Sequence, residues 1–535
     1  MDTAAETIGS GRGVLGIEFG STRIKACLVG DDPSTVLASG AFEWENELVD
    51  GVWTYSLDAV WTGLQTAYRE LVADIKSRYR VEPTSYRAIG VSAMMHGYLA
   101  FDETGELLVP FRTWRNTSTG DAAAELTDLF GVNIPLRWSI AHLHQAVRDG
   151  EPHVLSIRSI TTLAGYVHRR LTDRTALGVG DASGMFPIDP ATGGYDAALL
   201  ARYDELVKPS SLVAPLEQLL PEVLGAGKPA GNLTTAGAML IDPSGALQPG
   251  ILFAPPEGDA GTGMVATNAI APRTGNVSAG TSIFAMVVLE RPLTKLHHEI
   301  DIVTTPVGDP VAMVHCNNGA SELAGWVGLF QRFSELAGLD LDSDGVYDIL
   351  FREALAGAPD AGGLFAYNQL AGEPIADLSE GRPLFVRTPD SRLNLAGVMR
   401  AQLYGVFATL ALGMHVLADE GVALDRMFAH GGMFRTAGVA QRFLAGALDA
   451  PVATSRTAGE GGAWGMAVLA AFAAETAEAG DGASTDLASF LRDRVFATTE
   501  LATSEPDPDD VAGFAAYLDR YRDGLDVVRA AITAL

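Results

Sequence analysis

Two short turns carry the residue types that bind phosphate groups. The first lies within Glu18–Lys25 and contains Gly20, Ser21 and Thr22 between two apolar runs. A glycine lets backbone N–H groups approach a phosphate closely, and the hydroxyl groups add further donors. Glu18, at the end of the first apolar run, could hold Mg²⁺ or its water ligands. The pattern is equally typical of an ordinary β-hairpin turn, so this segment alone decides nothing.

A second turn of the same type, Gly280-Thr281-Ser282, lies in the other half of the chain. Either turn by itself is a weak signal. Together, with one near the start of each half of the sequence, they suggest two half-sites that clamp one polyphosphate from opposite sides. The two hairpins are also the nearest thing in this chain to an internal repeat.

The second half also contains glycine-rich entries into expected helices. Ala429–Thr436 includes Gly431, Gly432 and Arg435 between an expected strand and an expected helix. Backbone amides at a helix N-terminus suit an anion or a nucleotide. Glu460–Gly465 is a similar entry further along the chain. A glycine-lined turn without a ligand explains each segment equally well.

Four further places could contact a small substrate. Asp259 stands among glycines, where its carboxylate could project into a cleft, although a solvated turn residue fits as well. Met95 and His96 follow a buried strand, and a histidine there can hydrogen-bond a sugar hydroxyl or be satisfied inside the core. The segments 114–116 and 181–184 are polar loop clusters whose role the residue types do not settle.

Several other functions are excluded or disfavoured. The pattern at Gly11–Gly16 matches a dinucleotide fingerprint but precedes the first strand, and the chain contains no P-loop sequence. The formal net charge of −29 repels nucleic acid and anionic membranes, so we expect neither as a partner. With only Cys27 and Cys316, no run of about 18 apolar residues and no apolar leader, we expect a cytoplasmic protein.

Strands alternate with helices along the chain, which predicts an α/β protein. We expect strands at 14–17, 24–29, 87–93, 275–279, 283–289, 426–429 and 451–454. We expect helices at 58–79, 401–418, 437–448, 461–474 and 514–535. A boundary near 270–274 gives two domains, 14–270 and 275–535. The acidic stretch 475–508 is expected to be a surface excursion with a short helix near 487–494.

Taken in order, these segments resemble the FGGY carbohydrate kinases, the family of xylulokinase, glycerol kinase and gluconokinase. The resemblance runs from about residue 14 to residue 474 and is most xylulokinase-like. Gly16–Lys25 and Gly280–Ser282 look like the two phosphate motifs, and Ser92–Gly97 looks like the sugar-binding turn. Asp259 falls where the family carries its catalytic aspartate. The adenosine motif and the signature after it are matched by 431–441, 451–452 and 460–467.

The resemblance implies two actin-like (ribonuclease H-like) α/β domains, with ATP and a sugar bound in the cleft between them. It also implies Mg²⁺ and transfer of the γ-phosphoryl group to a sugar hydroxyl. Asp259 would be the general base and would contact the sugar together with Met95, His96, Trp114 and Arg115. Glu18 and Asp259 would hold the metal ion. ATP would be bound by Gly20, Ser21, Thr22, Lys25, Gly280, Thr281, Ser282, Gly431, Gly432 and Arg435.

Three residues depart from the family pattern. Glu18 and Asn116 stand where aspartates are usual, and Ala260 stands where xylulokinases have asparagine. The changes at Ala260 and Asn116 are expected on the sugar side of the cleft, so the substrate need not be D-xylulose. A ketopentose such as xylulose or ribulose remains the expected sugar.

Other readings stay open. The substrate could be another polyol or an aldonate, since Arg115 could pair with the carboxylate of an aldonate. An actin-like ATPase without sugar kinase activity would share both phosphate turns. A sugar-responsive regulator is disfavoured, because the acidic chain offers no basic helix-turn-helix. The expected partners are a small sugar and ATP, and the sequence leaves a homodimer open.

Overall fold

The structure, a computed structural model, describes residues 3–208, 212, 214–454, 461–480 and 485–535, and they form two compact units. Unit 1 consists of Met1–Ile270, Ile302–Val311 and Thr457–Thr498. Unit 2 consists of Ala271–Asp301, Ala312–Arg456 and Thr499–Leu535. The units therefore differ from the expected domains 14–270 and 275–535, because two segments from the second half of the chain pack with the first.

A six-stranded mixed sheet forms the centre of unit 1, with strand order β11-β6-β1-β2-β3 and β12 beside β6. These strands are β1 (Val14–Phe19), β2 (Arg23–Val29), β3 (Val36–Glu43), β6 (Ala88–Ala93), β11 (Leu252–Phe253) and β12 (Glu257–Gly258). Short two-stranded pairs are made by β4 (Glu47–Val49) and β5 (Val52–Thr54), β7 (Leu99–Phe101) and β8 (Ser159–Thr161), and β9 (Ala176–Gly178) and β10 (Glu222–Leu224).

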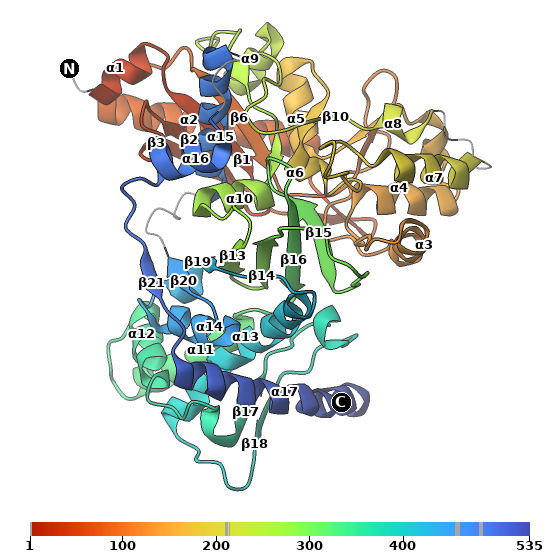
Figure 1. Cartoon of the computed structure of the whole chain (residues 1–535). Coiled ribbons are helices and arrows are strands. Elements are labelled where there is room, and N and C mark those ends of the chain that lie inside the picture. Colours follow the sequence, from red (N-terminus) through yellow and green to blue (C-terminus); the bar gives the residue numbers. More distant parts are fainter. Residues whose placement is uncertain (1–2, 209–211, 213, 455–460, 481–484) are drawn as a thin grey trace. The chain divides into compact units, whose positions relative to one another are not determined.

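The α-helices of unit 1 surround this sheet and extend beyond it (Figure 1). They are α1 (Thr3–Gly9), α2 (Leu57–Tyr79), α3 (Gly120–Phe130), α4 (Ser139–Arg148), α5 (Leu163–Thr172), α6 (Val179–Ala182), α7 (Ala197–Val207), α8 (Leu216–Leu219), α9 (Thr235–Ile241), α10 (Asp259–Thr267), α15 (Gly461–Ala479) and α16 (Leu487–Phe490). The longest of them, α2, begins where the Ser56 hydroxyl accepts the Ala59 N–H, which is a standard N-cap.

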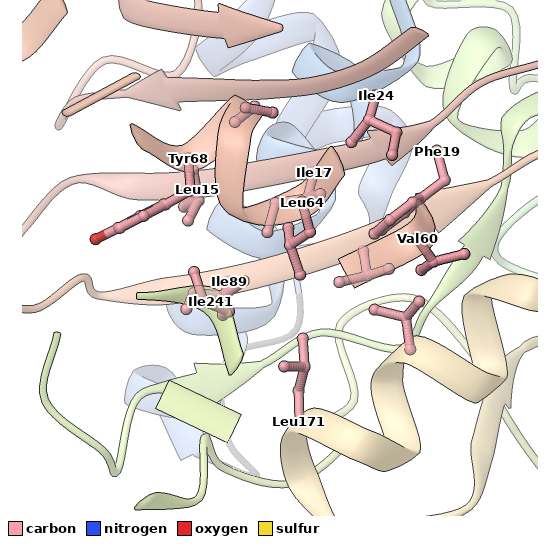
Figure 2. Packing of buried hydrophobic residues seen from close by; sticks show 14 of the residues in the cluster. Leu15, Ile17, Phe19, Ile24, Val60, Leu64, Tyr68, Ile89, Leu171 and Ile241 are labelled. Carbon is pink, nitrogen blue, oxygen red and sulfur yellow. The ribbon is translucent and has the colours of Figure 1, made fainter. Parts of the chain in front are cut away.

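Helix α2 packs on the sheet through apolar residues at helical spacing. Val60, Leu64 and Tyr68 of α2 belong to one buried cluster with Ile17 and Ile24 of the central hairpin (Figure 2). All of these side chains are almost completely buried. Burying a Leu or Ile side chain contributes about 1.5–3 kcal/mol, so this face of α2 stabilises the sheet that contains the hairpin.

Helix α15 also packs against the unit 1 sheet, on strands β1, β2 and β6 (Figure 1). Its approach to β1 is so close that a Cβ atom at Gly16 would overlap the Ala463 carbonyl oxygen. From Gly462 to Ala474 every residue of α15 is buried. A helix that is apolar on all sides must be covered on all sides, and this explains why the segment is buried.

The segment after α15 is only partly a surface excursion. The expected short helix is present as α16 and continues as one π-helical turn, Leu491–Val495. Leu487 and Phe490 are buried, and the Phe490 ring lies 5.3 Å from that of Phe472 in α15. Apolar residues at helical spacing thus return this acidic stretch to the core.

A seven-stranded sheet with strand order β15-β16-β14-β13-β19-β20-β21 belongs mostly to unit 2, although residues 302–311, which include the end of β15 and the start of β16, are assigned to unit 1. Its strands are β13 (Thr274–Ala279), β14 (Ile283–Val288), β15 (Ile300–Thr304), β16 (Pro310–Cys316), β19 (Arg426–His430), β20 (Val452–Thr454) and β21 (Ala502–Ser504). A separate antiparallel pair is formed by β17 (Leu364–Tyr367) and β18 (Leu384–Arg387). The α-helices are α11 (Ser321–Leu336), α12 (Ser343–Ala354), α13 (Leu395–Asp419), α14 (Val439–Leu448) and α17 (Pro508–Ala534).

Helix α13 is the central helix of unit 2. Within the described part of the chain, it alone has the length and apolar composition that would suffice to cross a membrane. The most apolar stretch of α13 is 72% buried inside the protein, and core helices share this composition. The Arg400 guanidinium of α13 pairs with the buried Asp510 carboxylate of α17, which ties the closing helix to this core.

Both units repeat one local arrangement. In unit 1, β1 pairs antiparallel with β2 and parallel with β6. In unit 2, β13 pairs antiparallel with β14 and parallel with β19. In both units the turn with glycine, serine and threonine follows the C-terminal end of the strand that has the parallel neighbour. The echo between the two hairpins that the sequence predicts is therefore a repeat of topology.

Candidate active site

The first phosphate turn, Gly20–Thr22, is held in place by two aromatic residues. The Trp44 indole N–H donates to the Gly20 carbonyl at 2.7 Å, and the Tyr55 hydroxyl donates to the Ser21 carbonyl at 2.7 Å. The Trp44 and Tyr55 rings stack with centroids 4.3 Å apart. Because its carbonyl oxygens are bonded from one side, the turn has a fixed shape, and Ser21 and Thr22 remain exposed.

Glu18 and Lys25 face each other across the hairpin next to this turn. Their Oε2 and Nζ atoms lie 3.8 Å apart, and both side chains are mostly covered. Burial raises the pKa of Glu18, and the nearby Asp259 carboxylate raises it further, while Lys25 and the Ala463 N–H lower it. Glu18 therefore lies at the N-terminus of α15, between a lysine and a second acid.

Asp259 is the first residue of α10 and follows β12 directly. β12 pairs in parallel with β6, which brings Asp259 beside the residues that follow β6. The Met95 N–H donates to Asp259 Oδ1 at 3.0 Å. Burial raises the pKa of Asp259, and the Met95 and Ala260 N–H groups oppose that shift. The structure thus joins three of the predicted site residues, Met95, Asp259 and, through its effect on the pKa, Glu18.

The sugar-turn candidate has an unusual backbone. His96 has φ of 72° and Gly97 has φ of 95°, so two consecutive residues adopt the left-handed region. Histidine rarely adopts this region, and such conformations concentrate at functional sites. The His96 side chain is nearly buried, with Nδ1 3.4 Å from the Gly184 carbonyl oxygen. This contact brings the loop 181–184 into the site.

Two buried acids beside Asp259 were not identified as site residues from the sequence. Asp181 accepts the Thr162 hydroxyl at 2.6 Å, and Glu257 accepts the backbone N–H groups of Gly180 and Asp181. Burial raises the pKa of Asp181 to about 7 and that of Glu257 to about 8. Asp181 belongs to the polar cluster 181–184 noted in the sequence without a role, and the signal for Glu257 was its place two residues before Asp259 in a glycine-rich turn.

Trp114, Arg115 and Asn116 form a separate cluster with Trp53. The Arg115 guanidinium lies 3.9 Å from the centroid of the Trp53 ring, a cation–π contact, and Trp114 is exposed. The Asn116 amide accepts the Trp53 N–H at 2.9 Å and donates to the Trp53 and Thr113 carbonyl oxygens. The expectation that Asn116 lies on the sugar side of the cleft stays a prediction, and in this structure its side-chain oxygen and N–H groups bond to the local backbone.

The second phosphate turn, Gly280–Ser282, lies in unit 2 and is braced by the segment before α11. The Gly319 N–H donates to the Thr281 carbonyl, and the Ala320 N–H donates to the Gly280 carbonyl, each at 2.8 Å. On the other side, Gly431 has φ of 109°, and a Cβ atom there would overlap the Ala279 carbonyl oxygen. Only glycine fits this approach, which brings Gly431 directly beside the turn.

A pocket of about 590 Å³ opens at this turn, entirely within unit 2. It is lined by the turn residues Ala279–Thr281, the start of α11, the α12 residues Asp344–Phe351, and the segment 432–436. Four predicted nucleotide residues, Gly280, Thr281, Gly432 and Arg435, are among the lining residues. The Tyr347 and Phe351 rings, in edge-to-face contact at 5.7 Å, form an apolar wall that the sequence did not indicate. Glu460, the first residue of the other glycine-rich entry, lies outside the described residues.

Two family models match this chain. The N-terminal domain of the FGGY family of carbohydrate kinases matches residues 13–244, and its C-terminal domain matches residues 275–474. The second match crosses from unit 2 into α15 of unit 1, as the fold requires.

Three solved structures share the fold over nearly the whole chain. A protein described as a xyloylose kinase from Brucella ovis is 20% identical with a TM-score of 0.78, covering 97% of this chain and 100% of its own. A xylulose kinase from Lactobacillus acidophilus is 16% identical with a TM-score of 0.76, covering 97% and 99%. A gluconate kinase from the same organism is 16% identical with a TM-score of 0.75, covering 96% and 98%. With both family models matched and this fold shared end to end, the chain belongs to the FGGY family of carbohydrate kinases.

Proposed function

We propose that this carbohydrate kinase transfers the γ-phosphoryl group of ATP to a hydroxyl group of a small ketopentose such as xylulose or ribulose. The observation that carries the proposal is the hydrogen bond from the Met95 N–H to Asp259. It joins the candidate sugar turn to the candidate base, so a hydroxyl bound beside Met95 and His96 would be near a carboxylate that can accept its proton.

In this mechanism the ionised Asp259 carboxylate accepts the hydroxyl proton as the sugar oxygen bonds to the γ-phosphorus. The bond from that phosphorus to the bridging oxygen breaks, ADP leaves, and Asp259 then releases the proton to solvent. The Met95 N–H fixes one carboxylate oxygen and so orients the other. Burial brings the pKa of Asp259 up toward the working pH, which makes it a stronger base than a solvated aspartate.

The unit 2 pocket supports binding of the nucleotide. Tyr347 and Phe351 offer an apolar face to a base, and the turn Gly280–Ser282 offers N–H and hydroxyl groups to phosphates. The start of α11 adds the positive end of a sixteen-residue helix on the same side. In unit 1, Gly20, Ser21, Thr22 and Lys25 are the matching phosphate-binding candidates.

The donor set is compatible with Mg²⁺. In the described part of the chain, no group of three or more His, Cys, Asp or Glu side chains is arranged to hold a metal ion. Mg²⁺ in kinases keeps several waters and is bound through one or two carboxylates plus the substrate phosphates. Glu18 and Asp259 would supply these carboxylates, and the ion would neutralise charge on the β- and γ-phosphates.

An aldonate is the second candidate substrate, and Arg115 is the observation that favours it. Its guanidinium is exposed and is held over Trp53, and this fixed cation could pair with a carboxylate.

We also propose that the protein is located in the cytoplasm. Cys27 and Cys316 are both buried and neither forms a disulfide, as expected in a reducing environment.

Release of ADP, measured over a panel of pentuloses, hexuloses, polyols and aldonates, tests the substrate. A pentulose should give the highest kcat/KM. A preference for aldonates that disappears in Arg115→Ala would identify the second candidate instead. ATP turnover that is the same with and without every sugar would favour an actin-like ATPase and overturn the proposal.

The variant Asp259→Asn tests the mechanism. It keeps the volume of the side chain but cannot accept the proton, so sugar-dependent ADP release should fall by about 10²–10⁴-fold while ATP still binds. Asp58→Asn, at an exposed position in α2, is the matched control and should keep full activity. Near-normal turnover by Asp259→Asn would show that another group is the base.

A further inference from the structure

A cluster of buried polar side chains lies behind the second phosphate turn in unit 2. Its members are Asn318, Asn368, Gln369 and Glu373, which are between 0% and 4% exposed. None of them lines the nucleotide pocket. A buried polar group is costly unless it is hydrogen-bonded, so a cluster of this size needs a reason to be present.

The cluster is organised around Asn318. Glu373 accepts both the Asn318 backbone N–H at 3.2 Å and the side-chain N–H of the same residue at 3.0 Å. The Asn318 side-chain oxygen in turn accepts the N–H groups of Leu370 and Ala371. Asn318 is therefore held at both ends of its amide and at its backbone, and a carboxylate is the acceptor for two of these bonds.

Asn318 is adjacent in sequence to the residues that hold the phosphate turn. The next two residues, Gly319 and Ala320, donate their backbone N–H groups to the carbonyl oxygens of Thr281 and Gly280. Asn368 donates to the carbonyl oxygens of Asn318 and Gly319, which fixes the same short segment from the other side. A Cβ atom at Gly319 would lie 2.5 Å from the Gly280 carbonyl oxygen, so the two backbones touch directly.

We propose that Glu373 and Asn318 are positioning residues that set the location of the Gly280–Ser282 turn and thereby of the β- and γ-phosphates of ATP. The inference rests on the proposed function, since it assigns that turn to phosphate binding. Glu373 fixes Asn318, and Asn318 places the Gly319 and Ala320 N–H groups that hold the turn. Phosphoryl transfer depends on in-line placement of the reacting atoms, and a shift of about 1 Å can cost about 100-fold in rate.

The proposal separates two parts of the nucleotide. The base and ribose would lie against Tyr347, Phe351 and the segment 432–436, and none of the cluster's hydrogen bonds described above goes to these residues. The terminal phosphates would lie against the turn that the cluster holds. Loss of Glu373 should therefore weaken the binding of ATP, which has all three phosphates. The binding of AMP, which has neither the β- nor the γ-phosphate, should be almost unaffected.

The experiment measures ATP and AMP affinity by titration calorimetry in wild type, Glu373→Ala and Glu373→Gln. Glu373→Ala should lower the affinity for ATP by about tenfold, which is the usual effect of losing one charged hydrogen-bond acceptor. The affinity for AMP should change by less than about twofold. Glu373→Gln keeps one acceptor oxygen and should fall between alanine and wild type. In steady-state assays the KM for ATP should rise and kcat should fall, while the KM for the sugar stays constant.

Glu420→Gln provides the matched control. Glu420 is another nearly buried carboxylate of unit 2, and it accepts hydrogen bonds from Thr294 and His297, away from the turn. The Glu420→Gln variant should leave the ratio of ATP affinity to AMP affinity unchanged.

Equal weakening of ATP and AMP in the Glu373 variants, or no change in either, would overturn the proposal. If Glu373→Ala does not fold, the ratio in Glu373→Gln decides the question. A wild-type enzyme that fails to bind ATP would instead overturn the proposed function.

Discussion

Three carboxyl groups, those of Asp181, Glu257 and Asp259, lie together in the interior of unit 1. Asp259 contributes to the raised pKa of Asp181, and Asp181 contributes to that of Glu257. Buried like charges disfavour one another, so near neutral pH at least one of the three carries a proton. The proposed base, Asp259, therefore has neighbouring acids, Asp181 and Glu257, that are at least partly protonated. This protonation limits the negative charge of the proposed site, to which ATP would bind.

Glu257→Gln tests this arrangement through stability. The pKa of Glu257 rises from an ordinary 4.5 to about 8 on folding, so the folded state holds a proton that the unfolded state has lost. The stability that this proton provides is fully present below pH 4.5 and is lost as the pH rises toward 8. In wild type the free energy of unfolding should decline over this range by up to about 1.4 kcal/mol per pH unit.

The glutamine variant should decline less steeply, because its side chain does not titrate. Urea unfolding at a series of pH values measures both slopes. Glu82→Gln, whose exposed carboxylate pairs with Lys76, is the control and should keep the wild-type slope. Equal slopes in wild type and Glu257→Gln would mean that Glu257 is ionised in the folded protein.

Helix α15 is the element that connects the second half of the chain with the first phosphate turn. The glycines of α15 and Gly16, the single glycine of β1, allow the two backbones to pack in direct contact. A Cβ atom at Gly16 would overlap Ala463 and Ala467, and one at Gly465 would overlap the Thr262 carbonyl oxygen. The position of Glu18, two residues beyond Gly16 in the same strand, depends on this approach.

Gly16→Ala should therefore affect both stability and activity. Overpacking of this kind costs about 1–3 kcal/mol, and the displaced strand should also lower kcat because Glu18 and Gly20 follow directly. Urea unfolding and sugar-dependent ADP release measure the two effects. Gly120→Ala is the control, since nothing lies near its added methyl group. Wild-type stability in Gly16→Ala would show that α15 does not pack tightly on β1.

Elements formed by neighbouring residues were predictable from sequence, and contacts across long separations were not. The two hairpins, α2 and α13 follow from local alternation or helical periodicity. The contact between Met95 and Asp259 spans 164 residues, and no local pattern encodes it. The same limit explains Asp181, whose polar cluster 181–184 was noted in the sequence but could not be assigned a role before its contact with Glu257 was known.

The return of α15 to unit 1 shows this limit at the level of an element. Its composition predicts a buried helix, but not which core buries it. Asn116 shows the limit for a single side chain, since its residue type suits both a sugar contact and a backbone clamp. The motif order nevertheless identified the family, because a series of weak signals in the right sequence is specific even where each signal is not.

The whole molecule carries a formal net charge of −29, which bears on its stability as well as its partners. Many like charges repel one another more in the folded state than in the expanded unfolded chain. Salt screens this repulsion, since the Debye length falls from about 30 Å at 0.01 M to about 8 Å at 0.15 M. The melting temperature should therefore rise as sodium chloride is added over this range.

Differential scanning calorimetry in a sodium chloride series tests the effect of charge. Sucrose at matched osmolality is the control and should not reproduce a rise that is concentrated below about 0.15 M, where screening changes most. A flat or falling melting temperature over the same range would indicate that the surface ion pairs offset the repulsion.

Because α15 lies late in the sequence, unit 1 cannot finish folding until most of the chain has been translated. A ribosome must translate residues up to Ala479 before the helix that packs on β1, β2 and β6 is complete. Until then Gly16 of β1 lacks the backbone of Ala463 and Ala467 that it packs against. The hairpin that carries Glu18 and Lys25 can therefore reach its final packing only near the end of synthesis.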